Sequence, residues 1–302
     1  MNHTPEKMLE TPDRQAAARR STLVSVAVNL LLTGSQVIAG LVSGSQGLIA
    51  DGIHSLSDLL TDFVVLVANH FSTKEPDETH HYGHMRYETA ASLVLGTLLL
   101  VVGAGMLWSS IVKLLHPENI AKVQILALWV ALVALAVKEG LFRYMLAVGK
   151  RVGSSMLVAN AWHARSDAAS SLVVAIGIVG NRMGFTLFDP VAALIVGLMV
   201  GRMGWSFAWQ ALDDLMDRAA SDEQHALIRE ALAATPGVLG FHDLRSRRMG
   251  DKILLDVHLE VHSTLSVRDG HDITVEARRR IREVVPVLSV MTHLDPVDVD
   301  TA

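Results

Sequence analysis

The chain contains no cysteine among its 302 residues. Disulfides and thiolate metal sites are therefore excluded, and any metal site must use imidazole and carboxylate ligands. Charged residues are also scarce, at 19% against 50% hydrophobic residues, which is typical of a chain that is partly embedded in a membrane. The formal net charge of −5 gives no reason to expect nucleic-acid binding.

The polar stretch 1–20 lacks the apolar core and the small-residue cleavage site of a signal peptide, so we expect it to stay in the cytoplasm. Six later stretches have the length of about 20 residues that a helix needs to cross a bilayer. They are Leu23–Val42, Leu48–Phe71, Ala90–Leu115, Val123–Val148, Met156–Val179 and Phe185–Trp209. We therefore expect a polar tail (1–20), an all-α six-helix transmembrane domain (21–212) and a C-terminal domain (213–302).

Basic residues favour an orientation with both termini in the cytoplasm, because cytoplasmic loops carry an excess of Lys and Arg. The expected cytoplasmic flanks hold Arg14, Arg19, Arg20, Lys74, Arg86, Arg143, Lys150, Arg151, Arg202 and Arg218. The opposite flanks hold only Lys113, Lys122 and Arg182.

The last ninety residues have the patterns of a small α+β domain. Asp222–Ala234 and Asp269–Val284 have helical spacing, and Val238–Arg248, Ile253–His262 and Val287–Leu294 read as strands. The order αββαβ predicts helices packed on one face of a sheet. Dimerisation would help a domain of this size to bury a sufficient core.

Two expected spans carry a histidine four residues before an aspartate, His54 with Asp58 and His163 with Asp167. Residues four apart share one face of a helix, and ionisable groups are costly in hydrocarbon unless they face partners, water or an ion. Two imidazoles and two carboxylates are enough for a tetrahedral metal site, and two carboxylates neutralise a divalent cation. Each pair taken alone is also compatible with a polar contact between helices.

Asp51 and Asp62 lie on roughly the same stripe of the second span, one turn to either side of this pair. We expect them to line the access path or to support the ligands, although Asp51 also fits an ordinary position at a helix start. In the fourth span, Glu139 and Arg143 have the spacing of an i,i+4 ion pair. This pairing is our explanation for the charges of that span, which also include Lys138.

Four motifs together resemble the cation diffusion facilitator family, most closely its bacterial zinc/proton antiporters. They are Ala50–Asp58, His80–Glu88, Asn160–Asp167 and His242–Arg245, and the resemblance extends over nearly all of Leu23–Pro296. It implies a homodimer in a bacterial-type inner (plasma) membrane and a ferredoxin-like cytoplasmic domain. It also implies protons as the counter-substrate, Zn²⁺ as both substrate and regulatory ligand, and no organic cofactor.

The resemblance also implies roles for individual residues. The transport site would be His54, Asp58, His163 and Asp167, and a second site in the loop between spans two and three would use Asp77, His80 and His84. A cytoplasmic two-metal site would use His242, His258, His271, His293 and Asp295, and an intersubunit charge interlock would use Arg86 and Asp217. From the residues alone, these loop and C-terminal histidines are better explained as surface groups, and only the resemblance favours metal sites.

The expected function is therefore efflux of a divalent metal by alternating access in exchange for protons. Zinc is favoured because His54 stands where some bacterial relatives have Asp, and the histidine form is similar to that of zinc-selective members. Efflux of Fe²⁺, Mn²⁺ or Cd²⁺ stays open, and so does a membrane metal sensor or scaffold that moves no metal. An enzyme is not expected, since no H-E-x-x-H motif occurs.

Overall fold

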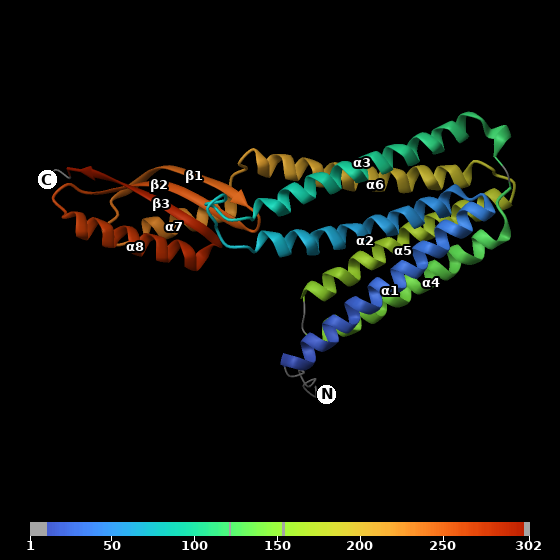
Figure 1. The fold of residues 1–302 in the computed structure, drawn as a ribbon, viewed down its shortest axis with the longest axis horizontal. Helices are drawn as coiled ribbons and strands as arrows, with labels where there is room; N and C mark the ends of the chain where they lie inside the picture. The colour runs from blue at the N-terminus through green and yellow to red at the C-terminus, as the bar shows by residue number, and fades with distance from the viewer. Residues whose placement is uncertain (1–10, 121, 153–154, 299–302) are drawn as a thin grey trace, which may run out of the picture. The chain divides into compact units, whose positions relative to one another are not determined.

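The computed structural model describes residues 11–120, 122–152 and 155–298. Within them, six long helices precede an αββαβ segment, which confirms the predicted fold class (Figure 1). The helices of the first part are α1 (Thr11–Ser43), α2 (Gln46–Ser72), α3 (Arg86–Leu115), α4 (Ile125–Val152), α5 (Ser155–Arg182) and α6 (Phe188–Leu215), with a short 3₁₀ turn η1 at Pro117–Asn119. The second part consists of α7 (Asp222–Ala233), β1 (Gly240–Met249), β2 (Lys252–His262), α8 (Val267–Val284) and β3 (Val287–Val297).

Most of the long helices extend beyond the predicted spans, because the helical backbone continues into the polar residues that flank each apolar stretch. α1, for example, begins at Thr11 rather than at Leu23. Among the described residues, four helices are long and apolar enough to cross a membrane, namely those containing Leu23–Ser43, Arg86–Leu115, Ile125–Arg151 and Phe188–Leu215. The other two long helices, α2 and α5, do not meet this criterion of length and apolar composition. They are the helices that carry the two H-x-x-x-D pairs.

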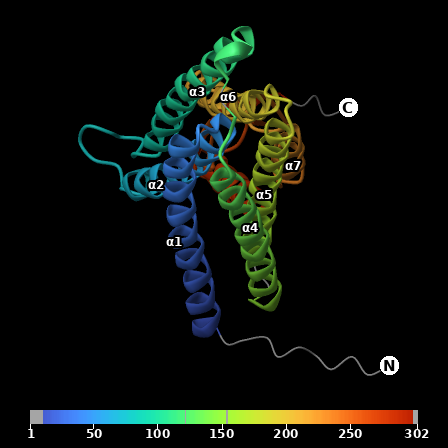
Figure 2. The same ribbon diagram turned by 90° about the vertical axis from the view of Figure 1, so that its right-hand side faces the viewer.

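The chain divides into two compact units, one made of residues 1–64 and 95–206 and the other of 65–94 and 207–302. Each unit is a group of residues that contact one another, whereas the predicted boundaries at residues 20 and 212 separate membrane from water. In the first unit, α4 and α5 lie side by side in both views (Figures 1 and 2). Phe142 and Met145 of α4 pack on Ala161 and Ala164 of α5, whose small side chains allow the two helices to approach closely.

The start of α2 is held by a carboxylate from another helix. Asp189, in the first turn of α6, is buried and accepts hydrogen bonds from Ser45 Oγ (2.5 Å), Gln46 N (2.7 Å) and Gly47 N (3.3 Å). A negative group at a helix N-terminus pairs with backbone N–H groups that have no partner within the helix. Asp189 therefore fixes where α2 begins.

In the second unit the sheet has the order β1-β2-β3, with β1 and β2 antiparallel and β2 and β3 parallel. The parallel pair is connected through α8, as a parallel pair requires a crossover. Ile228, Leu232 and Ile281 of α7 and α8 pack with Leu255 and Leu259 of β2, and all five are fully buried. β3 runs to Val297, beyond the predicted end at Leu294, so that Asp295 lies within the sheet.

Candidate metal centres

The first cluster lies inside the membrane-spanning unit and joins α2 to α5. His54, Asp58 and Asp167 each offer a ligand atom, and these atoms lie within 4.8 Å of one another. His54 Nδ1 is 3.7 Å from Asp58 Oδ2, and His54 Nε2 is 4.0 Å from Asp167 Oδ1. The side chains are only 7% (His54) and 14% (each aspartate) exposed.

Two atoms of this cluster lack a partner. His54 Nδ1 and Asp58 Oδ2 are buried, and neither makes a hydrogen bond within the described part of the chain. Buried polar atoms are almost always paired, and an unpaired one points to an ion or a rearrangement. A cation between the imidazole and the carboxylates would satisfy both atoms, so the donor set fits a metal.

His163 is placed differently from the other three predicted ligands. It lies on α5 one turn before Asp167, but its side chain is exposed and stands outside the cluster. The structure thus brings together three of the four predicted residues. Asp62, one turn after Asp58 on α2, is exposed as well.

Asp51 is fully buried, and its partner is a residue that sequence reasoning did not connect to it. Lys138 Nζ of α4 lies 3.3 Å from Asp51 Oδ1. The predicted pair of Glu139 and Arg143 does form, with Arg143 Nε 2.8 Å from Glu139 Oε1 at an exposed position, but it does not involve Lys138. Lys138 itself could have indicated this ion pair, because a cation inside the membrane needs a counter-charge nearby.

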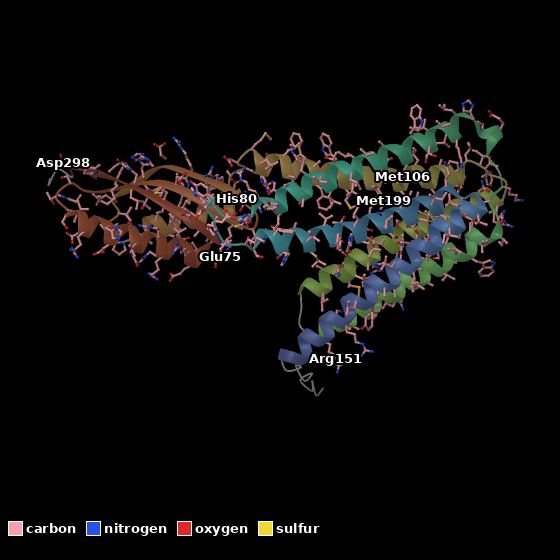
Figure 3. The ribbon with its side chains drawn as sticks, in the orientation of Figure 1. Glu75, His80, Met106, Arg151, Met199 and Asp298 are labelled. Atoms are coloured by element: carbon pink, nitrogen blue, oxygen red, sulfur yellow. The ribbon has the colours of Figure 1, made fainter. Side chains whose placement is uncertain are left out.

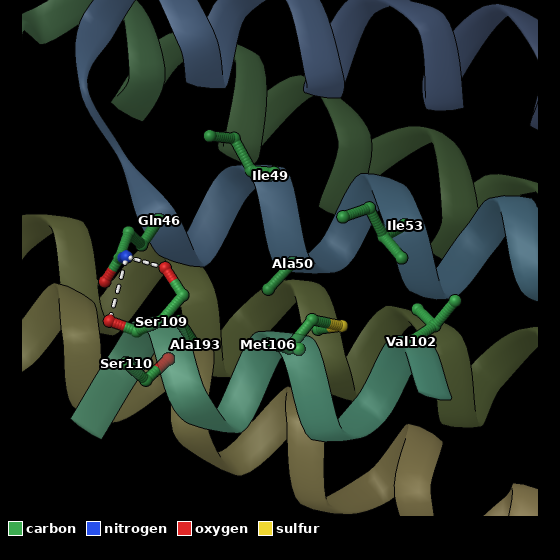
Figure 4. A pocket seen from close by; sticks show the side chains of 10 residues that line it. Gln46, Ile49, Ala50, Ile53, Val102, Met106, Ser109, Ser110 and Ala193 are labelled. Carbon is green, nitrogen blue, oxygen red and sulfur yellow. Dashed lines mark hydrogen bonds between the residues drawn. The ribbon is translucent and has the colours of Figure 1, made fainter. Parts of the chain in front are cut away.

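A cavity of about 260 Å³ lies nearby but does not resemble a cation site. Its lining comes from α2, α3 and α6 and includes Ala50, Ile53 and Met106, and Gln46 donates a hydrogen bond to Ser109 Oγ (2.8 Å) at its edge (Figure 4). None of the ten residues that line it is charged or a histidine. The cavity is therefore distinct in chemistry from the His54 cluster.

The second cluster lies in the connection between α2 and α3, where Figure 3 labels His80. Asp77 Oδ1 is 3.4 Å from His80 Nδ1, and Asp77 Oδ2 is 3.3 Å from His84 Nε2. The structure thus brings all three predicted loop residues together. Hydrogen bonds from the hydroxyl and the backbone N–H of Thr79, and from the backbone of His80, hold the pKa of Asp77 well below its usual range. The carboxylate is therefore ionised and oriented towards both imidazoles.

The third cluster is a row of histidines across the sheet. The strand register pairs His242 with His258 and His258 with His293, so one imidazole comes from each strand. Asp295 is 2.9 Å from His258 Nδ1, 3.2 Å from His242 Nε2 and 3.4 Å from His293 Nε2. The hydrogen bond with His258, followed by the nearby imidazoles, lowers the pKa of Asp295. One carboxylate thus faces three potential ligands.

Two residues qualify the predicted composition of this third cluster. His271 lies exposed on α8, and the described cluster of ligand atoms within 4.8 Å consists of His242, His258 and Asp295. Glu260, which was not predicted, faces Asp295 in the register and lies 3.9 Å from His242 Nε2. Charged and apolar residues alternate along β2, and this alternation puts Glu260 on the same face of the sheet as His258.

Arg86 and Asp217, predicted to form an interlock between subunits, form an ion pair within the single chain. Arg86 Nη2 lies 2.7 Å from Asp217 Oδ1, and Arg247 Nη1 lies 3.3 Å from Asp217 Oδ2. Asp217 has a positive φ of 61°, a conformation that non-glycine residues rarely adopt.

Comparisons with known proteins agree with this arrangement. One family model, described as the cation efflux transmembrane domain, matches residues 22–216, and a second, the cation efflux protein cytoplasmic domain, matches 220–297. An uncharacterized transporter of Methanocaldococcus jannaschii is 34% identical over 276 residues, which cover 91% of this chain and 97% of that protein. A manganese efflux system protein of Bacillus subtilis is 30% identical, covering 94% of this chain and 98% of that one. Metal tolerance protein C1 of Arabidopsis thaliana is 35% identical, covering 88% of this chain and 59% of that one. The chain therefore belongs to the cation diffusion facilitator family and is an integral membrane transporter for divalent cations, not an enzyme.

Proposed function

We propose that the protein exports Zn²⁺ from the cytoplasm in exchange for protons, through a transport site made of His54, Asp58, His163 and Asp167. The observation that carries this proposal is the buried cluster of His54, Asp58 and Asp167 with its unpaired ligand atoms. Burial without hydrogen-bond partners is costly unless the cluster binds a cation for part of its cycle. The two carboxylates supply the charge that a divalent cation requires.

A small tetrahedral ion would draw the three clustered side chains closer together. Zinc binds N and O ligands at about 2.0–2.2 Å, which places neighbouring ligand atoms about 3.4 Å apart in a tetrahedron. Ligand atoms of His54, Asp58 and Asp167, one from each side chain, lie within 4.8 Å of one another, so binding the ion would draw them together by up to about 1.4 Å. His163 would complete the site as its fourth ligand after a movement of its side chain or of α5.

Proton exchange follows from the ligand chemistry. Metal binding requires neutral imidazole and ionised carboxylate, so protons and metal compete for the same atoms. Protonation on the far side would expel the metal, and release of protons on the cytoplasmic side would restore the site. Imidazole changes its charge in the range where small pH differences matter, which makes His54 and His163 the proposed proton carriers.

We propose that both termini are cytoplasmic, in a bacterial-type inner membrane, and that the protein works as a homodimer. The match to the cytoplasmic domain of cation efflux proteins and the distribution of basic residues support this orientation. The cluster around Asp295 would then sense cytoplasmic metal and bias the inward- and outward-facing states by differential affinity. If His242→Ala combined with His293→Ala left the Zn²⁺ dependence of transport unchanged, this regulatory role would be ruled out.

Manganese is the second candidate, because the Bacillus subtilis relative is named a manganese efflux protein. His54 favours zinc over manganese, since imidazole suits Zn²⁺ and carboxylate or carbonyl oxygen suits Mn²⁺. Fe²⁺ and Cd²⁺ efflux would use the same mechanism. A metal sensor or scaffold would bind the metal with no flux at all.

The test is flux of Zn²⁺, Mn²⁺, Fe²⁺ and Cd²⁺ into proteoliposomes at matched pH. We expect Zn²⁺ to be transported fastest and Asp58→Ala or Asp167→Ala to abolish uptake. Asp256→Ala, at an exposed position of β2, is the matched control and should transport normally. Uptake that persisted in both transport-site variants would remove the proposed site.

A further inference from the structure

Asp51 and Lys138 form the most deeply buried ion pair among the described residues. Their side chains are 1% and 3% exposed, whereas every other described pair has at least one partner that is 14% exposed or more. Pairs of this kind are not needed for stability, since well-packed apolar residues of similar volume serve as well or better. A fully buried ion pair in a membrane span therefore points to a role in function.

Four helices contribute to the hydrogen bonds of this pair. Asp51 of α2 accepts hydrogen bonds from Gln36 Nε2 of α1 (2.5 Å) and from Ser170 Oγ (2.9 Å) and Ser171 Oγ (2.5 Å) of α5. Lys138 of α4 donates to Asp51 and to Ser171 Oγ (2.8 Å). Both carboxylate oxygens thus have partners, and the network links the four helices to one another.

The network lies directly beside the transport cluster, on one side of it. Asp51 precedes His54 by one turn of α2, and Ser170 follows Asp167 by one turn of α5. Lys138 Nζ also lies 3.4 Å from the backbone oxygen of Asp167. With cytoplasmic termini, α2 runs inward and α5 runs outward, so the network stands on the outer side of the cluster.

Exposure increases in the opposite direction. The side chains are 1–3% exposed in the pair and 7–14% exposed in the cluster. One turn further towards the cytoplasmic side, both Asp62 and His163 are exposed. Since ionisable groups of membrane proteins face protein or water rather than hydrocarbon, this gradient describes a site that is open inward and closed outward.

We propose that the Asp51–Lys138 pair, with Gln36, Ser170 and Ser171, is the outer gate of the transport site. It is closed in this structure, and the pair must separate before the metal can leave on the far side. Asp51 and Lys138 act as positioning residues that bind no metal themselves. This inference rests on the proposed transport site and on the proposed orientation.

The absence of cysteine allows a direct test with one introduced thiol. Ser55 neighbours His54, is 5% exposed, and its Oγ has no hydrogen-bond partner within the described residues, so Ser55→Cys removes no observed contact. The full-length Ser55→Cys protein is placed in right-side-out and inside-out membrane vesicles. A membrane-impermeant methanethiosulfonate reagent is then added to the outside, and the labelling rate is measured for each orientation.

We expect slow labelling from the outer side when the gate is intact. Asp51→Asn combined with Lys138→Gln removes both charges and leaves no unpaired ion, so the variant should fold. It should be labelled at least about tenfold faster from the outer side, with no increase from the cytoplasmic side. The conservative pair Asp51→Glu and Lys138→Arg should keep outer labelling slow.

The matched control is the exposed pair on the same helix, Glu139→Gln with Arg143→Gln, which should leave both labelling rates unchanged. An unchanged outer rate in the Asp51→Asn, Lys138→Gln variant would overturn the gate, and so would an equal acceleration from both sides, which indicates general loosening.

Zn²⁺ flux of the unmodified protein is measured separately. A transporting protein with an unchanged outer rate would refute the gate and keep the proposed function. A gated protein without flux would refute the function.

Discussion

Replacing one partner of the buried Asp51–Lys138 ion pair should destabilise the protein far more than replacing both partners. Lys138→Met leaves the Asp51 carboxylate buried with three hydroxyl or amide donors but no counter-charge. Removing one partner of a buried pair costs roughly 3–5 kcal/mol, whereas replacing both with apolar residues is often neutral. We therefore expect Lys138→Met and Asp51→Leu each to lower the free energy of unfolding by about 3–5 kcal/mol.

The double variant Asp51→Leu, Lys138→Met should cost much less than the sum of its parts. The coupling energy of this double-mutant cycle is then about 3 kcal/mol or more, larger than almost all contacts between surface residues. Unfolding in mixed detergent micelles can be followed by the fluorescence of the five tryptophans. The cycle Glu139→Gln, Arg143→Gln is the control, and its coupling should stay at or below about 0.5 kcal/mol because that pair is exposed. Additive losses in the Asp51–Lys138 cycle would refute the argument from burial.

Three other predictions concern separate parts of the chain. Asp295→Asn should abolish metal binding by the cytoplasmic cluster, because Asp295 faces three imidazoles. Equilibrium dialysis measures this binding, and the control Asp256→Asn should retain it. Metal binding retained in Asp295→Asn would exclude Asp295 as a ligand. Hydrogen bonds from Arg279 and Arg280 lower the pKa of Glu276 to about 2, so its stabilisation is fully present above the unfolded pKa of about 4.3 and is lost as the pH falls towards 2. Glu276→Gln should make acid unfolding between these pH values shallower in circular dichroism, and an unchanged slope would contradict the assignment. Gly103→Leu should prevent folding, since a Cβ at Gly103 would lie 2.8 Å from the Gly201 backbone. The control Gly105→Leu has open space and should give a normal yield of monodisperse protein. Equal yields for the two variants would contradict the close approach of α3 and α6.

The parts of the site that could be predicted depend on local spacing. His54 and Asp58 are four apart on one helix, so their proximity follows from helix geometry alone, and Glu139 with Arg143 follows in the same way. In the C-terminal domain, the alternation along β2 placed His258 and Glu260 on one face before any register was known. Local periodicity was sufficient in each of these cases.

The remaining parts depend on contacts between distant residues. Lys138 meets Asp51 across 87 positions of sequence, and neither helical period nor local charge pattern specifies such a contact. His163 has the same spacing to Asp167 as His54 has to Asp58, yet it is exposed, because spacing determines a face of the helix and not what covers that face. β3 continues three residues beyond its predicted end, through Pro296, because it is an edge strand of the sheet, where proline is tolerated.

The central claim, that protons drive metal through the His54, Asp58, His163 and Asp167 site, is tested most directly by measuring both ions at once. Proteoliposomes with an acidic interior are given external Zn²⁺, and Zn²⁺ uptake and internal pH are recorded together. We expect uptake accompanied by internal alkalinisation, with both signals lost in Asp167→Asn. Zn²⁺ binding without uptake, or uptake that is indifferent to the proton gradient, would contradict the account.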